Sequence, residues 1–484
     1  MGALHVIILF HSLLQVLFVI RVLLRPNREP TSRLAWMVVI LLVPVLGMVS
    51  YLLLGETRMG WRRLAQHEAA KERLPGPEDM ASQTAAIGQV VAFEPQNRYA
   101  ELFRVGQSIS GFAPAGGNTA RLMADAEDTI ASMVADMDAA QDHVHLLVYI
   151  WLPDGNGTRV AEALIRAAQR GVTCRAMADD LGSRAMIAHP LWSQMQDAGV
   201  RLARALPIGN VLLRALIGRV DLRNHRKIVV IDNAVTYCGS QNCADPAFLP
   251  KAKYAPWVDV VMRLTGPVVR QNQLLFAADW MAEVPQDDLR SLVTAPIPSP
   301  GAGFAAQVIA QGPTDKPSAA PEMFASLMYA AERELLVTTP YYVPVDSLQS
   351  ALRAAAHRGV DVTLILPARN DDFAVAAASR SYYADLIGAG VKLYEYRPGL
   401  LHAKSMTIDG AVTLIGSANM DCRSFALNFE NNILLQDAEI TLALRARQLS
   451  YLEDSTRISA EQVAGWGWRR QLWNNTLAIV GPLL

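Results

Sequence analysis

One polar pattern occurs twice in this chain, and it constrains the fold more than any other feature. The first copy contains His225, Lys227 and Asp232 and ends in Gly239-Ser240-Gln241-Asn242. The second copy contains His402, Lys404 and Asp409 and ends in Gly416-Ser417-Ala418-Asn419, at a constant offset of 177 residues. Both copies read H-x-K-(4)-D-(6)-G-S-x-N. Six matched positions at identical spacing indicate a duplicated unit rather than two unrelated buried strands with stray polar residues.

The spacing within each copy predicts what its side chains do. Residues 228–231 form a β-branched run that is typical of a buried strand. Because side chains alternate along a strand, His225 and Lys227 face the same way, and Asp232 faces the other way and ties down the strand end. Histidine can act as nucleophile or proton donor, lysine supplies positive charge, and the Gly-Ser turn with its Asn offers hydrogen bonds to an oxyanion. Two such sets suggest phosphoryl chemistry in two steps.

The duplication extends to the elements around the motif. Strand-like runs at residues 145–151 and 175–179 are echoed by runs at residues 334–339 and 362–366, and a helical stretch separates the members of each pair. Strands that alternate with helices of ten or more residues predict βαβ units and a mostly parallel sheet. We therefore expect an α/β fold made of two similar halves in a pseudo-two-fold arrangement.

Two apolar stretches open the chain. Residues 34–54 carry no charge and would span about 31 Å as a helix, whereas His5, His11, Gln15 and Arg21 interrupt residues 3–24. A signal peptide is the alternative, but no small-residue cleavage site follows and the second apolar stretch comes at once. We expect a transmembrane hairpin of two helices, with a tight link at residues 25–33. The link and the exit carry three arginines each, so the positive-inside rule does not orient it.

The net charge and the cysteines limit the functional classes and the cellular compartment that fit this chain. The formal net charge of −1 gives no global basic excess of the kind that marks a nucleic-acid binder. Residues 201–227 are the exception, with seven Arg or Lys against one acid, and they suit an anionic membrane surface or a core helix with solvent-facing arginines. The four cysteines need no pairing, which favours a reducing compartment and a cytoplasmic catalytic domain: Cys174, Cys238, Cys243 and Cys422.

These features divide the chain into four parts. We expect the transmembrane hairpin over residues 1–60, a linker and entry segment over 61–118, the first half over 119–297 and the second half over 298–484. Residues 466–484 mix tryptophan, arginine and aliphatic residues, which is an interfacial composition too short to span a membrane. Packing against the catalytic domain is the alternative for this last segment.

The repeated pattern resembles the HKD motif of the phospholipase D superfamily. Three further stretches resemble bacterial cardiolipin synthases, and with the hairpin the resemblance covers nearly the whole chain: Tyr149-Ile-Trp-Leu-Pro-Asp154, Thr339-Pro-Tyr-Tyr-Val-Pro344 and Ser417-Ala-Asn-Met-Asp-Cys-Arg-Ser-Phe425. It implies that two phospholipase D-like α/β/α domains pack face to face and share one active site.

The resemblance also implies roles for individual residues. The catalytic set is His225, Lys227, Asp232, His402, Lys404 and Asp409, and the substrate-binding set is Ser240, Asn242, Ser417 and Asn419. Two acids follow the Gly-Ser turns, and in this superfamily such acids orient the histidine of the opposite half. We therefore expect Asp259 to pair with His402 and Glu430 to pair with His225.

The reaction that the resemblance implies joins two phosphatidylglycerols to give cardiolipin and glycerol through a phosphatidyl-histidine. No cofactor or metal is expected, because the lysines compensate the charge. His225 is the nucleophile by family habit, since symmetry alone would permit the reverse. Phosphatidylethanolamine as donor and water as acceptor stay open, and water would make the chain a phospholipase D-type hydrolase.

The partners and the location follow from the same resemblance. A membrane-tethered nuclease is a weaker alternative, because nothing outside residues 201–227 suggests a long basic groove. We expect a multi-pass protein of the bacterial inner membrane that binds phospholipids and no nucleic acid, with the oligomeric state left open.

Overall fold

The computed structural model describes residues 2–25, 30–56, 59–76, 98–209, 218–219, 221–295, 301–313 and 319–479. They form two compact units. The smaller unit consists mainly of Met1–Leu64 and Ile208–Leu222, and the larger one mainly of Ala65–Pro207 and Arg223–Pro482. The expected boundary near residue 297 between two halves stays a prediction, because both halves belong to the larger unit.

The smaller unit contains three apolar helices, α1 (Ala3–Leu24), α2 (Pro30–Leu42) and α3 (Pro44–Leu54). Within the described ranges, residues His5–Leu24 are the one stretch long and apolar enough to cross a membrane. The structure differs from the single second helix predicted over residues 34–54, because the chain breaks at Val43. Pro44 has no N–H to donate and its ring crowds the preceding turn, so the helix stops and restarts there.

A buried carboxylate ties the ends of these helices together. Glu56, which follows α3, accepts hydrogen bonds from Arg21 Nε at 2.7 Å and from the Tyr51 hydroxyl at 3.2 Å. Arg219 of the same unit donates to the backbone oxygen of Leu54 at 2.6 Å. Arg219, within the basic segment predicted at residues 201–227, is therefore anchored to the end of α3. Residues 210–217 and 220 of this segment lie outside the described residues.

The larger unit is organised around one sheet, to which sixteen strands of the described residues belong. At its centre β1 (Ala115–Leu122) pairs with β10 (Phe304–Gln311). Outward from β1 the order is β9 (Val261–Thr265), β7 (Val235–Gly239), β6 (Ile228–Ile231), β2 (His143–Val148), β3 (Thr173–Asp179) and β4 (Arg201–Ala205). Outward from β10 the equivalent order is β19 (Asn428–Gln436), β17 (Val412–Gly416), β16 (Ser405–Ile408), β11 (Glu334–Thr338), β13 (Asp361–Pro367), β14 (Lys392–Tyr396) and finally β20 (Ser455–Arg457).

This strand order confirms the α/β class and the duplicated, pseudo-two-fold halves. The prediction of a mostly parallel sheet is wrong. Among the described strands of this sheet, parallel pairing is confined to β2-β3-β4, to β11-β13-β14 and to the two-residue strand β5 (Arg223–Asn224) on β19, whereas the motif strands pair antiparallel with their neighbours. The connection between β6 and β7 is the three residues 232–234, too short for a parallel crossover, which needs a dozen or more.

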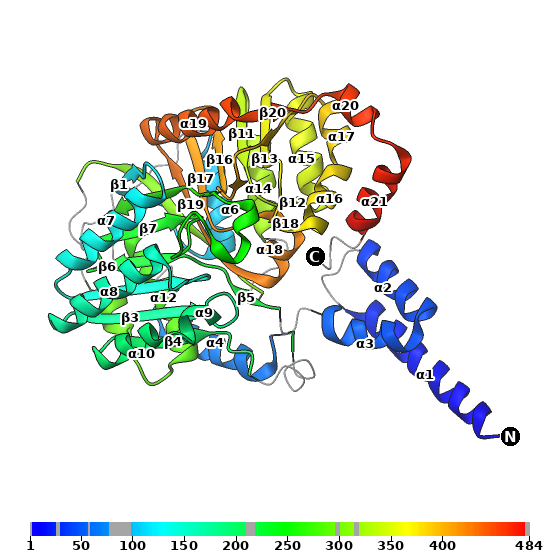
Figure 1. The fold of residues 1–484 in the computed structure, drawn as a ribbon, viewed down its shortest axis with the longest axis horizontal. Coiled ribbons are helices and arrows are strands. Elements are labelled where there is room, and N and C mark those ends of the chain that lie inside the picture. The colour runs from blue at the N-terminus through cyan, green and yellow to red at the C-terminus, as the bar shows by residue number, and fades with distance from the viewer. Residues whose placement is uncertain are drawn as a thin grey trace. The chain divides into compact units, whose positions relative to one another are not determined.

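Helices cover both faces of the sheet (Figure 1). On one face lie α12 (Val268–Glu283) and its counterpart α19 (Ala438–Glu453). On the other face lie α7 (Ala126–Ala139), α8 (Gly155–Gln169) and α10 (Pro190–Asp197) in the first half, and α14 (Ala319–Ala330) and α15 (Asp346–His357) in the second. Along β6, Ile228 and Val230 pack in the core that contains α12, and Val229 and Ile231 pack in the core that contains α7 and α8. Both sides of the motif strand are thus buried and its register is fixed.

Candidate active site

Both copies of the repeated motif open into one cavity of about 620 Å³. The first half contributes His225 and Asn242 to its wall, and the second half contributes His402 and Asn419. All four side chains are buried. The structure therefore brings the two motifs together at a single site, as the resemblance implies.

Two short ladders between the halves position the histidines. Residues Arg223–Asn224 (β5) run parallel to the start of β19, and the backbone N–H of His225 donates to the Phe429 carbonyl at 2.9 Å. In the equivalent place, Leu400–Leu401 (β15) run parallel to Trp257–Val258 (β8), and the N–H of His402 donates to the Val258 carbonyl at 2.8 Å. Each histidine backbone is therefore held by the half to which it does not belong.

The same ladders bring each histidine ring to an acid of the opposite half. His225 Nδ1 lies 2.9 Å from Glu430 Oε2, and His402 Nδ1 lies 2.6 Å from Asp259 Oδ1. These are the two pairs that the resemblance implies. Because an ionised carboxylate only accepts hydrogen bonds, Nδ1 carries the proton in each ring and Nε2 is left for chemistry.

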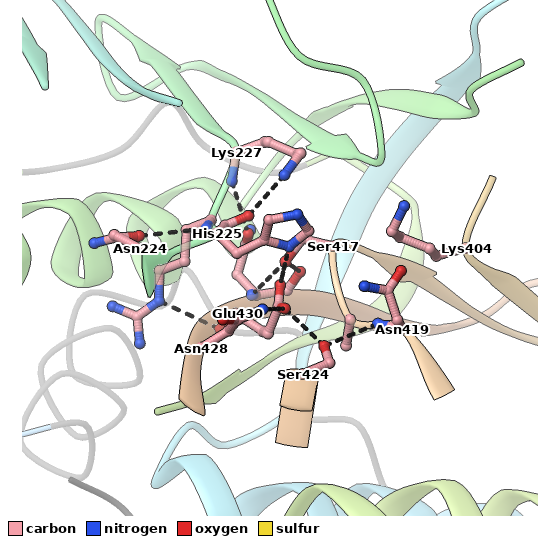
Figure 2. Close-up of polar contacts among 12 residues, drawn as sticks. Asn224, His225, Lys227, Lys404, Ser417, Asn419, Ser424, Asn428 and Glu430 are labelled. Atoms are coloured by element: carbon pink, nitrogen blue, oxygen red, sulfur yellow. Dashed lines mark hydrogen bonds and ion pairs between the residues drawn. The ribbon is translucent and has the colours of Figure 1, made fainter. Parts of the chain in front are cut away.

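The two acids are held to different degrees. Glu430 accepts hydrogen bonds from the hydroxyls of Ser417 and Ser424, the latter at 2.7 Å, and from Asn428 Nδ2 at 3.1 Å (Figure 2). Besides its histidine, Asp259 accepts a hydrogen bond from Ser240 Oγ at 2.6 Å. The orientation of the His225 ring is therefore fixed by more contacts than that of His402.

The motif serines do not lie where we expected them. The resemblance implies that Ser240 and Ser417 bind substrate, but each hydroxyl donates to the acid of its own half and accepts a backbone N–H, from Val260 and Asn431 respectively, at 3.0 Å. Both serines are fully buried, and neither lines the cavity. Since each acid contacts the histidine of the other half, the serines act on the histidines through the acids.

The motif lysines place two positive charges beside the histidines. Lys227 Nζ donates to the carbonyl of His225 at 2.8 Å, and Lys404 Nζ donates to that of His402 at 2.7 Å. Burial lowers the pKa of Lys227 to about 8. Burial, with the like charge of Lys227, lowers the pKa of Lys404 to about 7. Two buried cations beside the two histidines favour an anion bound at this site.

The motif asparagines complete an anion site. Asn242 Oδ1 accepts the backbone N–H of Ile150 at 3.1 Å, which leaves its amide NH₂ for the cavity. Asn419 also lines the cavity, and its backbone N–H donates to Ser424 Oγ at 3.0 Å. Each lysine ammonium group can only donate hydrogen bonds, and each asparagine side chain has an NH₂ group that donates. Together these four groups suit the non-bridging oxygens of a phosphate.

Burial makes both histidines poor proton acceptors. Burial, with the nearby lysine charges, lowers the pKa of His225 to about 4. The pKa of His402 is lowered for the same two reasons. Burial alone would raise the pKa of Asp259, but the charges of His402 and Lys404 outweigh it and lower the pKa to about 2. His225 is thus neutral near pH 7, as a nucleophile must be, and Asp259 is ionised.

The motif aspartates lie away from the cavity. Asp232 accepts the backbone N–H groups of residues 141–143 at 2.8 to 2.9 Å, just before β2. Asp409 accepts those of Arg333 and Glu334 at 2.7 and 2.9 Å, just before β11. Both were grouped with the catalytic residues, and the structure corrects that grouping. They anchor the turn before the neighbouring strand, as the parity of the strand predicts.

Sequence reasoning gave no role to several groups that the structure places at the site. Tyr149 packs its ring 4.7 Å from that of His225, and Trp257 packs 4.6 Å from His402. Arg223 and Arg423 line the cavity and add positive charge to its wall. The aromatic residues were visible in conspicuous sequence stretches, but their contact with the histidines depends on the fold.

The described residues contain no group of three or more His, Cys, Asp or Glu that could hold a metal ion. The imidazole, amide and guanidinium groups that line the cavity are donors that suit a bound anion.

Comparisons with known proteins agree with this geometry. A family model described as "Cardiolipin synthase, PLD-like domain" matches residues 133–262 and 324–448, one segment in each half. A second, described as a phospholipase D-nuclease N-terminal region, matches residues 13–56. The structure of a phosphatidylserine synthase from Haemophilus influenzae has a TM-score of 0.59 over 79% of this chain and 99% of that chain, at 13% identity, which shows a shared fold.

Similarity to curated relatives extends over most of the chain. Cardiolipin synthase A of Salmonella arizonae is 35% identical over 462 residues, which cover 94% of this chain and 92% of that protein. Cardiolipin synthase A of Salmonella paratyphi B gives the same values. With both halves, the N-terminal region and nearly the full length matched, the chain belongs to the cardiolipin synthases with phospholipase D-like domains.

Proposed function

We propose that this protein is a phosphatidyltransferase that joins two phosphatidylglycerols into cardiolipin and releases glycerol. The observation that carries the proposal is the single cavity lined by two histidines, each oriented by an acid of the opposite half, and by two asparagines, with a buried lysine beside each histidine. This set suits a phosphodiester whose headgroup is exchanged through a covalent intermediate. Membership of the cardiolipin synthases supports the choice of phospholipids as substrates.

In the first step His225 attacks the phosphorus of the donor lipid. Its Nε2 forms the nitrogen–phosphorus bond while the bond from phosphorus to the glycerol headgroup breaks. His402, protonated next to the negative phosphodiester, gives its Nε2 proton to the departing glycerol oxygen. Glu430, hydrogen-bonded to Nδ1, stabilises the positive charge that the phosphorylated ring of His225 acquires.

In the second step the acceptor lipid enters the place that glycerol left. His402, now neutral, removes a proton from a hydroxyl of the second phosphatidylglycerol, and that oxygen attacks phosphorus. The nitrogen–phosphorus bond breaks, its electron pair returns to His225, and cardiolipin is formed. Lys227, Lys404, Asn242 and Asn419 hold the non-bridging oxygens through both steps.

The acceptor decides between this function and its nearest alternative. The same intermediate attacked by water would give phosphatidic acid, the product of a phospholipase D-type hydrolase. Purified protein in detergent, incubated with phosphatidylglycerol labelled in the headgroup, should release labelled glycerol and form cardiolipin in equal amounts. Glycerol release with phosphatidic acid in place of cardiolipin would overturn the synthase proposal and support hydrolysis.

The membrane location is part of the proposal. The helix at His5–Leu24 supports insertion into a membrane, and α2 with α3 is proposed to re-cross it, so that the protein is multi-pass in the bacterial inner membrane. The free cysteines support a cytoplasmic catalytic unit, because three of them are buried thiols that are not joined in disulfides.

A further inference from the structure

Large apolar side chains are exposed on the larger unit in a restricted area. Among its described residues, nine have large exposed hydrophobic side chains, and seven of these lie around the cavity mouth or on one helix beside it. The seven are Leu181, Leu249, Phe373, Trp468, Leu472, Trp473 and Ile479, and the other two are Tyr329 and Leu442. Single exposed apolar residues need no explanation, but a concentration of this kind marks a binding surface.

Three of the seven surround the mouth of the active-site cavity. Leu181 itself lines the cavity. Leu249 is 74% exposed and lies between Phe248 and Pro250, which both line it. Phe373 is 71% exposed and directly follows the lining residue Asp372. Because Leu181 and Leu249 come from the first half and Phe373 from the second, the apolar rim extends across both halves.

A C-terminal helix extends this rim. Helix α21 (Trp468–Ile479) packs beside α16 (Phe373–Ser381), as Figure 1 shows, and α16 begins with Phe373. Leu477 and Ala478 pack against a small core that contains Val375 of the cavity wall. The four apolar residues of α21 counted above stay exposed. The C-terminal segment therefore packs against the catalytic domain and also exposes apolar side chains. These are the two alternatives that its composition allowed.

The charges around the rim complement an anionic surface. Lys251 and Lys253 lie in the short helix η1 (Leu249–Tyr254), and Arg469 and Arg470 lie on α21 next to its tryptophans. Exposed Arg184 adds a further cation at the mouth. Of the acids there, Asp371 is covered by Lys251 at 2.6 Å and by the Tyr341 hydroxyl, and Asp372 accepts backbone N–H groups at the start of α16. Tryptophan and aliphatic side chains interleaved with Arg and Lys are typical of membrane interfaces.

We propose that this rim, made of Leu181, η1, the start of α16 and helix α21, is a membrane-contact surface that seats the cavity mouth on a bilayer containing anionic phospholipid. This inference rests on the proposed lipid substrate. The cavity, at about 620 Å³, falls within the roughly 300–1,000 Å³ of sites for one small ligand, so it does not hold the acyl chains of two lipids. With the rim in the interface, the headgroups enter the cavity and the acyl chains stay in the bilayer.

The test compares the same lipid headgroup in a bilayer and in solution. Full-length protein is reconstituted in phosphatidylcholine vesicles that contain a varied fraction of long-chain phosphatidylglycerol. In parallel, it is given dihexanoyl phosphatidylglycerol below its micelle concentration. Leu249→Ser, Phe373→Ser and the double variant should raise the KM for vesicle phosphatidylglycerol about tenfold, whereas turnover of the soluble lipid stays within about twofold. Tyr329→Ser and Leu442→Ser, exposed apolar residues away from the rim, are the matched controls and should change neither.

A second measurement detects contact directly. A fluorophore on Leu249→Cys should be quenched by lipids brominated on their acyl chains, and one on Leu442→Cys should not. Wild-type rates for the rim variants on vesicles, or equal losses on both substrates, would overturn the proposal. So would a rim variant that changes the oligomeric state instead, because the rim would then contact a second copy of the chain. Quenching without any cardiolipin product from the wild type would overturn the proposed function and leave the contact surface standing.

Discussion

His225 and Glu430 are separated by 205 residues in the chain, yet Nδ1 of the first lies 2.9 Å from a carboxylate oxygen of the second. The parallel ladder between β5 and β19 makes this contact, and the reciprocal ladder between β15 and β8 brings His402 to Asp259. Each half therefore supplies the acid that orients the histidine of the other half. An active site built in this way needs both halves folded together.

The nucleophile can be identified by trapping the covalent intermediate. Burial lowers the pKa of both histidines and an acid of the opposite half holds each ring, so the expectation that His225 is the nucleophile rests on the resemblance to the superfamily. With a donor that has a good leaving group, His402→Ala should still accumulate lipid-labelled enzyme, whereas His225→Ala should not. Turnover should fall by about 10²- to 10⁴-fold in His402→Ala, as for loss of a general acid. Label that is retained by His225→Ala alone would reverse the assignment.

Ser424 positions the nucleophile without touching substrate. Its hydroxyl donates to Glu430 at 2.7 Å, and the Glu430 carboxylate orients the His225 ring. Ser424→Ala should lower kcat by about tenfold, and KM should change little. Ser424→Thr, which keeps the hydroxyl, should recover part of the loss. Ser326→Ala, at a partly exposed helical serine that donates to a backbone oxygen, is the control. If the rate of intermediate formation were the same in Ser424→Ala and the wild type, the positioning role would be excluded.

The motif aspartates contribute to stability rather than to chemistry. Asp232 accepts three backbone N–H groups and has a φ of 51°, a left-handed conformation that alanine adopts at a cost. Asp232→Ala should therefore lower the free energy of unfolding by about 1–3 kcal/mol. Asp197→Ala, on an exposed helix end, should have no such effect. Thermal unfolding measures the difference, and equal melting temperatures for Asp232→Ala and Asp259→Asn would contradict it.

Much of this architecture could be predicted from the sequence. Two identical spacings imply a duplication, and the parity of β6 separates Asp232 from His225 and Lys227. The pairing of the strands could not be read in the same way. The motif strands pair antiparallel because only the three residues 232–234 connect β6 to β7. The alternation of strands and helices elsewhere in each half predicts parallel pairing, and it does not apply to this short connection. Pro44, which causes the break at Val43, is visible in the sequence. The absence of charge over residues 34–54 nevertheless predicts one continuous helix.

The contacts around the acids could not be predicted. Ser424 and Asn428 meet Glu430 only because the short helix α18 (Cys422–Leu427) folds back beside the start of β19. Spacing along the sequence contains no information on that approach. The serines of the motif were misplaced for the same reason, since a Gly-Ser turn can present its hydroxyl to a substrate or to a neighbouring acid.

The buried lysines predict the alkaline side of the pH profile. Burial lowers the pKa of Lys404 to about 7 and that of Lys227 to about 8, so the free enzyme loses positive charge as pH rises through this range. Values of kcat/KM should therefore fall further above pH 7 to 8, on the alkaline side of the decline that begins where His402, whose pKa burial lowers, gives up its proton. A bound phosphodiester favours the charged lysines, so the corresponding fall in kcat should come at higher pH. On the acid side, His225 keeps its lone pair down to about pH 4.

Replacement of one lysine tests this assignment. In Lys404→Arg the guanidinium stays charged throughout, so the alkaline fall in kcat/KM should move upward to the range set by Lys227. An unchanged alkaline limb in this variant would assign the fall to another group.

A topology reporter distinguishes one membrane crossing from two. If α2 and α3 together re-cross the membrane, the link between α1 and α2 and the end of the chain lie on opposite sides. If α1 crosses alone, they lie on the same side. With a cytoplasmic catalytic unit and two crossings, a reporter active only in the periplasm should be silent after Leu484 and active when inserted at residues 27–32. Silence at both positions would leave α1 as the single crossing, and activity after Leu484 would place the catalytic histidines outside the cytoplasm.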